Sequence, residues 1–219
     1  MEEKINITIP ENISDITLGQ FLRYEELKKR DIDTYNFNKR VIEIFTRLPF
    51  NKIDKIKASD YTRIVNQIEA ALMQDVKFEP RFEMQGIKFG FIPNLDKITL
   101  GEYSDLSQYG VDESTLHNLM AVLFRPVVKE IGSKYEIMQY KGTEEFAELM
   151  KDMPLNCVNG ALVFFYSLAN ELQEATQRCL SQELQKEMKP KTTSRTLDGI
   201  RQLKGWLETI SLRYHKSLS

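Results

Sequence analysis

Apolar residues recur along this chain at two different periods, and the period separates the expected helices from the expected strands. A spacing of three and four residues predicts helices over about residues 18–30, 37–48, 59–72, 100–108, 113–124, 143–152 and 154–188. Alternation of apolar and polar residues predicts strands near residues 5–9, 77–84, 87–92 and 134–140. The pattern therefore predicts an α+β fold that is mostly helical. A small antiparallel sheet packs with the helices, and a long C-terminal helix leads into an extension.

Two of the expected helices begin with the same pattern. Ile9-Pro10 precedes Ile16-Thr17-Leu18-Gly19-Gln20-Phe21, and Ile92-Pro93 precedes Ile98-Thr99-Leu100-Gly101-Glu102-Tyr103 at nearly the same distance. In both copies the threonine is a good N-cap, and the Gln or Glu three residues later completes a capping box. The predicted structural caps are therefore Thr17, Gln20, Thr99 and Glu102.

The chain divides into a body over residues 1–188 and a C-terminal extension over residues 189–219. The boundary is marked by Lys189-Pro190-Lys191-Thr192-Thr193-Ser194, which is typical of a linker. If the shared helix starts reflect a duplication, the body consists of two related halves, about 5–75 and 87–180. Two unrelated helix starts with good caps explain the same pattern, so both interpretations remain open.

Charge also separates the extension from the body. From residue 184 onward there are eight Lys or Arg and three Asp or Glu, whereas the rest of the chain carries 22 basic and 29 acidic residues. The C-terminal part is thus near +5 and the rest near −7, although the whole chain carries only −2. Apolar residues at helical spacing predict an amphipathic helix in the extension. The candidate inter-subunit contacts on this helix are Arg201, Lys204, Trp206, Leu207, Ile210, Arg213 and Tyr214.

Three kinds of contact are open to this helix, which is too short to be stable alone in water. It could dock on the acidic surface of another copy, on its own body, or on nucleic acid. The acidic body favours the first of these. It would repel the backbone of a duplex, so we expect no specific nucleic-acid recognition.

Composition places the chain among soluble globular proteins. It has 219 residues, of which 28% are charged and 42% hydrophobic, which excludes collagen-like, disordered and disulfide-scaffold classes. No apolar run approaches the roughly 20 residues of a membrane span, and Met1-Glu2-Glu3-Lys4 does not resemble the start of a secretory signal. The two cysteines, Cys157 and Cys179, are expected to be reduced thiols in a cytosolic or particle-bound protein.

Catalytic and cofactor signatures are missing from the sequence. There is no phosphate-binding loop, GxGxxG, HExxH or GxSxG. His117 and His215 lack the spacing of metal ligands. The apolar surroundings of Cys157 in the sequence predict a buried thiol rather than a nucleophile. Glu144-Glu145 is typical of a solvated helix start, and Arg125 of a buried arginine that organises a turn. We therefore expect a protein that is not an enzyme, with no catalytic, metal-binding or cofactor-binding residue and no cofactor.

Three blocks of the sequence resemble virion structural proteins of crAss-like and related Bacteroidetes tailed phages. The first is Phe91-Ile92-Pro93-Asn94-Leu95-Asp96-Lys97-Ile98-Thr99-Leu100-Gly101-Glu102-Tyr103, and the second is Leu119-Met120-Ala121-Val122-Leu123-Phe124-Arg125-Pro126. The third joins Met153-Pro154-Leu155 to Gly160-Ala161-Leu162-Val163-Phe164-Phe165-Tyr166. The likeness extends over about residues 5–180 and does not include catalytic motifs.

This resemblance implies a multi-copy component of the head–tail connector or tail barrel, located in the virion and assembled in the host cytoplasm. Such proteins form homo-oligomeric rings on or below the portal. The implied partners are therefore other copies, the portal and other tail or connector proteins, with DNA passing through the lumen and no membrane involved. A phage tail or baseplate assembly chaperone, absent from the mature virion, is the alternative, and a phage-encoded enzyme is the third class.

Overall fold

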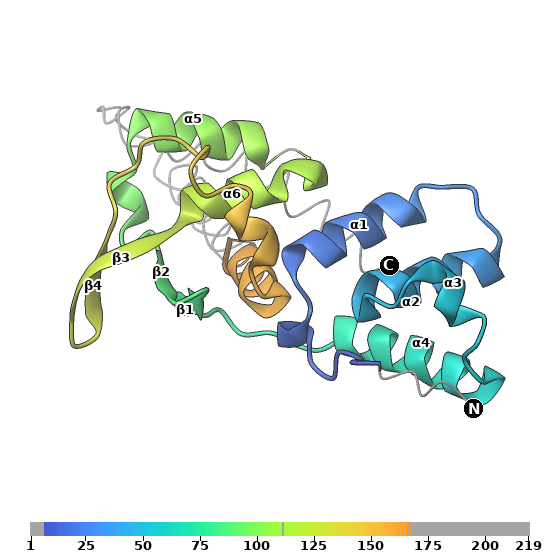
Figure 1. The fold of residues 1–219 in the computed structure, drawn as a ribbon. Coiled ribbons are helices and arrows are strands. Elements are labelled where there is room, and N and C mark those ends of the chain that lie inside the picture. The colour runs from blue at the N-terminus through green and yellow to red at the C-terminus, as the bar shows by residue number, and fades with distance from the viewer. Residues whose placement is uncertain (1–6, 111, 166, 168–219) are drawn as a thin grey trace, which may run out of the picture.

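The computed structural model describes residues 7–110, 112–165 and 167 (Figure 1). Helices α1 to α4 form one end of the molecule, and the sheet with α5 and α6 forms the other. The α-helices are α1 (Leu18–Lys28), α2 (Thr34–Thr46), α3 (Phe50–Ile53), α4 (Ala58–Leu72), α5 (Leu100–Tyr109) and α6 (Leu116–Leu123). Short 3-10 helices are η1 (Ile13–Asp15), η2 (Leu95–Lys97), η3 (Glu113–Thr115) and η4 (Leu149–Asp152).

The pairs α1–α2 and α5–α6 are antiparallel hairpins that are closed in a similar way. The Gln20 side chain, in the first turn of α1, donates a hydrogen bond to the carbonyl oxygen of Ile44 (3.0 Å) in the last turn of α2. Glu102, in the first turn of α5, accepts a hydrogen bond from Arg125, two residues after α6 ends. In each hairpin, a capping side chain of the first helix therefore reaches the end of the second.

Four antiparallel strands form one sheet in the order β1-β2-β3-β4. The turn between β1 and β2 is Gln85-Gly86, with φ angles of 52° and 75°, as a two-residue hairpin turn requires. The predicted hairpin around this turn is confirmed. The strands are β1 (Arg81–Met84), β2 (Ile87–Phe91), β3 (Phe124–Ile131) and β4 (Lys134–Ile137).

The strand predictions fail at two places. Residues 7–9 form no strand, and the rest of the predicted strand 5–9 lies outside the described residues. Ile7 and Ile9 are half-buried against the core, so their alternation reflects one-sided burial of an extended segment. The fourth strand of the sheet is instead β3, where the sequence predicted the end of helix 113–124 and an interruption at Pro126. Because α6 passes into β3 without a loop and residues 119–124 are all apolar, periodicity could not locate this boundary.

Other boundaries shift by a few residues. The strand predicted over 77–84 begins only at Arg81, and the one predicted over 134–140 ends at Ile137. The expected helix over 143–152 is not α-helical. It consists of turns followed by the 3-10 helix η4.

A helix over residues 155–165 lies between the two ends of the molecule (Figure 1). Just before it, the carbonyl oxygen of Met153 accepts a hydrogen bond from the N–H of Leu18 (2.9 Å), which ties this helix to the start of α1. A Cβ at Gly160 would lie 2.6 Å from the carbonyl oxygen of Lys77, so the close packing there leaves no room for a side chain. The predicted continuation of this helix to residue 188 and the extension lie outside the described residues. Within the described part, no helix is long and apolar enough to cross a membrane.

Candidate functional site

Both predicted capping boxes are present in the structure. The hydroxyl of Thr17 accepts a hydrogen bond from the N–H of Gln20 (3.2 Å), and the Gln20 side chain accepts one from the N–H of Thr17 (2.9 Å). Thr99 and Glu102 make the same two contacts at 3.2 Å and 2.6 Å. These four residues therefore satisfy backbone N–H groups that a helix start leaves without partners.

Removing the cap at Thr99 should cost stability alone. We expect Thr99→Ala to lower the free energy of unfolding by about 1 kcal/mol, because the N–H of Glu102 loses its acceptor. Urea denaturation would measure this, with Ser104→Ala, an exposed change on the same helix, as the control. A large assembly defect in a Thr99→Ala protein of near-normal stability would contradict the purely structural role.

Glu102 and Arg125 form an ion pair in the protein interior. Their side chains are only 5% and 9% exposed. The Tyr140 ring lies 5.4 Å from the Arg125 guanidinium carbon, and the Tyr140 hydroxyl donates a hydrogen bond to Asp105. Burial, together with this hydrogen bond, raises the pKa of Tyr140 well above its ordinary value, so the hydroxyl remains a donor. The predicted burial of Arg125 is confirmed. The predicted turn is wrong, because Arg125 lies in strand β3 and its ion pair joins that strand to the first turn of α5.

A cleft of about 730 Å³ opens between the two helical hairpins. One wall is α1 with Arg47, the residue that follows α2, and the other wall is formed by η3, the first turn of α6 and η4. Lys29, the residue that follows α1, and Glu113 of η3 form an ion pair across it at 3.9 Å. We call this hollow the inter-hairpin cleft, and it is the candidate functional site because both halves of the molecule contribute to it.

The carboxylates that line the inter-hairpin cleft all have partners. Glu25 pairs with Lys28 at 3.0 Å, and Glu26 pairs with Arg30 at 2.6 Å. Asp152 accepts a hydrogen bond from the Gln85 side chain at 2.9 Å, and Glu113 pairs with Lys29. Within the described part of the chain, in contrast, the guanidinium groups of Arg23 and Arg47 have neither an ion pair nor a hydrogen bond.

His117 lines the same cleft. Burial and nearby Lys151 lower the pKa of His117 below its ordinary value, so the ring is neutral at pH 7. Its Nδ1 atom is buried and has no hydrogen-bond partner in the described structure. Among the described residues no group of three or more His, Cys, Asp or Glu side chains could hold a metal ion.

Cys157 is a buried, free thiol. Burial, helped by the nearby carboxylate of Glu79, raises its pKa to about 12. Because the thiolate is the nucleophilic form, this thiol is unreactive at neutral pH. Cys179 and His215 lie outside the described residues.

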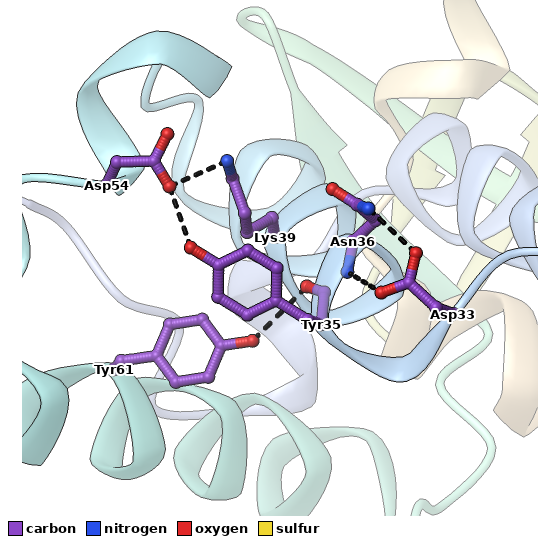
Figure 2. A network of polar contacts seen from close by, with 6 residues as sticks. All are labelled: Asp33, Tyr35, Asn36, Lys39, Asp54 and Tyr61. Atoms are coloured by element: carbon purple, nitrogen blue, oxygen red, sulfur yellow. Dashed lines mark hydrogen bonds and ion pairs between the residues drawn. The ribbon is translucent and has the colours of Figure 1, made fainter.

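A second polar network joins α2, α3 and α4 (Figure 2). The ammonium group of Lys39 is buried, pairs with Asp54 at 2.7 Å, and lies 4.1 Å from the centre of the Phe50 ring. The Tyr35 hydroxyl donates a hydrogen bond to the same Asp54 oxygen (2.9 Å), and the Tyr61 hydroxyl donates one to the Tyr35 carbonyl oxygen (3.4 Å). The hydrogen bonds from Lys39 and Tyr35 hold the pKa of Asp54 below its ordinary value.

The charges of Lys39 and Asp54 are paired with each other within this network. We therefore interpret the network as a structural contact that holds three helices together. The apolar pattern of the sequence did not predict this network. The available signal was a lysine on the apolar face of a helix, since Lys39 lies three residues before Ile42 and both are buried. Its partner Asp54 lies fifteen residues along the chain, and no local pattern connects the two.

The seven candidate inter-subunit contacts, from Arg201 to Tyr214, lie outside the described residues. The described residues of this subsection thus include four groups: the caps, the buried ion pair, the inter-hairpin cleft and the polar network around Lys39 and Asp54. A scan against protein-family models, a search of curated proteins and a search of solved structures each found no match to this chain.

Proposed function

We propose that this chain is a non-enzymatic structural protein of a tailed-phage virion. It would be present in several copies, as a ring in the head–tail connector or tail barrel close to the portal. The proposal begins from the resemblance of residues 91–103, 119–126, 153–155 and 160–166 to virion proteins of crAss-like and related phages. Its partners would be other copies of the chain, the portal and neighbouring tail proteins.

The Glu102–Arg125 ion pair is the observation that carries this proposal. Glu102 belongs to the first of the three blocks and Arg125 to the second, and the two side chains meet in the interior. A resemblance made of separate surface segments could be accidental. In this chain, by contrast, two of the resembling blocks contact each other in the core, where residues specify the fold. This contact supports a common architecture with those virion proteins.

Aromatic packing brings the third block to the same place. The Phe91 ring from the first block lies 5.2 Å from that of Phe124 in the second and 5.7 Å from that of Phe165 in the third, centre to centre. Phe124 and Phe165 are almost completely buried. One aromatic cluster therefore contains a residue from each of the three blocks, as expected if the resemblance reflects a shared core.

Charge supports assembly through unlike surfaces. The chain outside the last 36 residues is near −7 and those residues are near +5. Opposite charges on different parts of one chain favour head-to-tail contacts, which close into a ring when the rotation between subunits allows it. An acidic inner surface would also let DNA pass through the lumen without being held.

The test is mass spectrometry of purified virions of the phage that encodes this chain, with the copy number measured against the portal protein. We expect a portal-like copy number or a simple multiple of it. Expression during infection together with absence from mature particles would contradict the proposal and favour the assembly chaperone.

A further inference from the structure

We propose that the inter-hairpin cleft binds an acidic segment of a second copy of this chain, and that Glu144-Glu145 supplies the carboxylates. The inference rests on the proposed ring and names one of its subunit contacts. Arg23 and Arg47 line the cleft, whereas the acidic pair lies in the turns that precede η4. The two surfaces come from different parts of the chain, as a head-to-tail contact requires.

Among the charged side chains that line the inter-hairpin cleft, those without any hydrogen-bond or ion-pair partner in the described part of the chain are positive. Its four lining carboxylates, Glu25, Glu26, Glu113 and Asp152, are held by ion pairs or a hydrogen bond within the subunit. Lys151 is likewise paired, with Glu148 at 2.7 Å. Two guanidinium groups remain without a partner among the described residues, and a guanidinium presents a planar fork of donors that matches a carboxylate.

The position of Arg47 is fixed by its backbone. Its φ of 58° lies in the left-handed region, and its N–H donates a hydrogen bond to the carbonyl oxygen of Glu43 (3.0 Å), which closes the end of α2. A non-glycine residue is uncommon in this conformation. The backbone therefore holds the root of this arginine at the edge of the cleft, so that less of its freedom is lost when it binds a partner.

The proposed counterpart is equally unsatisfied. Glu144 and Glu145 are both exposed, and neither carboxylate has an ion pair or hydrogen bond within the described part of the chain. They are consecutive residues in a turn, so two carboxylates reach the partner from one short segment. Arginine–carboxylate hydrogen bonds between ionised groups are among the stronger ones in proteins.

A nucleic acid fits this cleft less well than a short acidic protein segment. A phosphate backbone carries a regular series of negative charges, whereas the cleft offers two guanidinium groups without a partner among the described residues. A segment with two carboxylates can place each one at a guanidinium and present neutral atoms elsewhere.

Self-association of the full-length chain tests the inference, measured by analytical ultracentrifugation over a range of protein concentrations. The cleft variant is Arg23→Gln with Arg47→Asn, since asparagine tolerates the left-handed conformation. The loop variant is Glu144→Gln with Glu145→Gln. The control is Arg63→Gln with Lys129→Gln, which removes the same charge from two exposed ion pairs outside the cleft.

We expect the cleft and loop variants each to weaken self-association about tenfold or more, while the control stays within about twofold. A mixture of the cleft and loop variants should form dimers, because one supplies an intact loop and the other an intact cleft. Those dimers should not grow into rings.

Normal self-association of the cleft variant would overturn this inference and leave the ring proposal intact. A wild-type chain that stays monomeric at all concentrations would overturn both. If the cleft variant self-associates normally but no longer binds a labelled oligothymidylate of about ten nucleotides, the occupant is nucleic acid and the inference is wrong.

Discussion

Replacing Glu102 with Gln is expected to lower the free energy of unfolding by about 3–5 kcal/mol, the cost of leaving one charge of a buried ion pair without its partner. The change is nearly isosteric, so it does not open a cavity. Equilibrium denaturation in urea of the Glu102→Gln protein measures the effect.

Loss of the cap cannot account for this cost. Gln20 occupies the equivalent place in the first hairpin, and its amide oxygen accepts the hydrogen bond from the N–H of Thr17. A glutamine at position 102 can do the same for Thr99. A glutamine has no second carboxylate oxygen to accept the hydrogen bond from Arg125. The Arg125 side chain is only 9% exposed, so it cannot reach water without moving its surroundings.

Two further variants make the test specific. Glu148→Gln removes one side of the exposed pair between Glu148 and Lys151, whose side chains are 79% and 39% exposed. Its effect on the free energy of unfolding should be much smaller than that of Glu102→Gln. Adding Arg125→Met to Glu102→Gln removes the unpaired charge and should recover part of the loss, because apolar groups often replace a buried ion pair at little cost. A Glu102→Gln protein as stable as the Glu148→Gln protein would show that the buried pair does not stabilise the fold.

The sequence predicted local features well because their determinants lie within a few residues of each other. A capping box depends on two residues three apart, and both boxes are present at Thr17 and Thr99. The Gln85-Gly86 turn likewise follows from two residues that adopt left-handed φ angles.

Features that join distant segments could not be predicted in the same way. Strand β3 was missed because Leu119 to Phe124 is apolar throughout and therefore fits the end of a helix as well as the start of a strand. The inter-hairpin cleft depends on how the two hairpins meet. Arg23 and Arg47 appear in the sequence as ordinary surface charges. Only the structure shows that the carboxylates around them have other partners, and that these two guanidinium groups have none among the described residues.

Deletion of residues 190–219 is expected to leave a folded body that loses its higher assembly. The extension carries the basic charge that complements the acidic body. Its deletion therefore removes the contacts that the extension would make with neighbouring subunits. Native mass spectrometry should show that the truncated chain forms smaller oligomers than the full-length chain does. Far-ultraviolet circular dichroism should show no loss of helix beyond that of the deleted residues.

A matched variant separates charge from length. Changing Arg201, Lys204 and Arg213 to Gln keeps the extension but removes three of its positive charges. This variant should weaken assembly in low salt more than in high salt, because salt already screens such contacts.

Unfolding of the truncated body would show instead that the extension packs on its own subunit. Unchanged assembly after deletion would leave the inter-hairpin cleft as the remaining proposed contact. The cleft variant and the deletion therefore test different halves of the same head-to-tail arrangement. Only a chain that uses both contacts would lose its rings in either experiment.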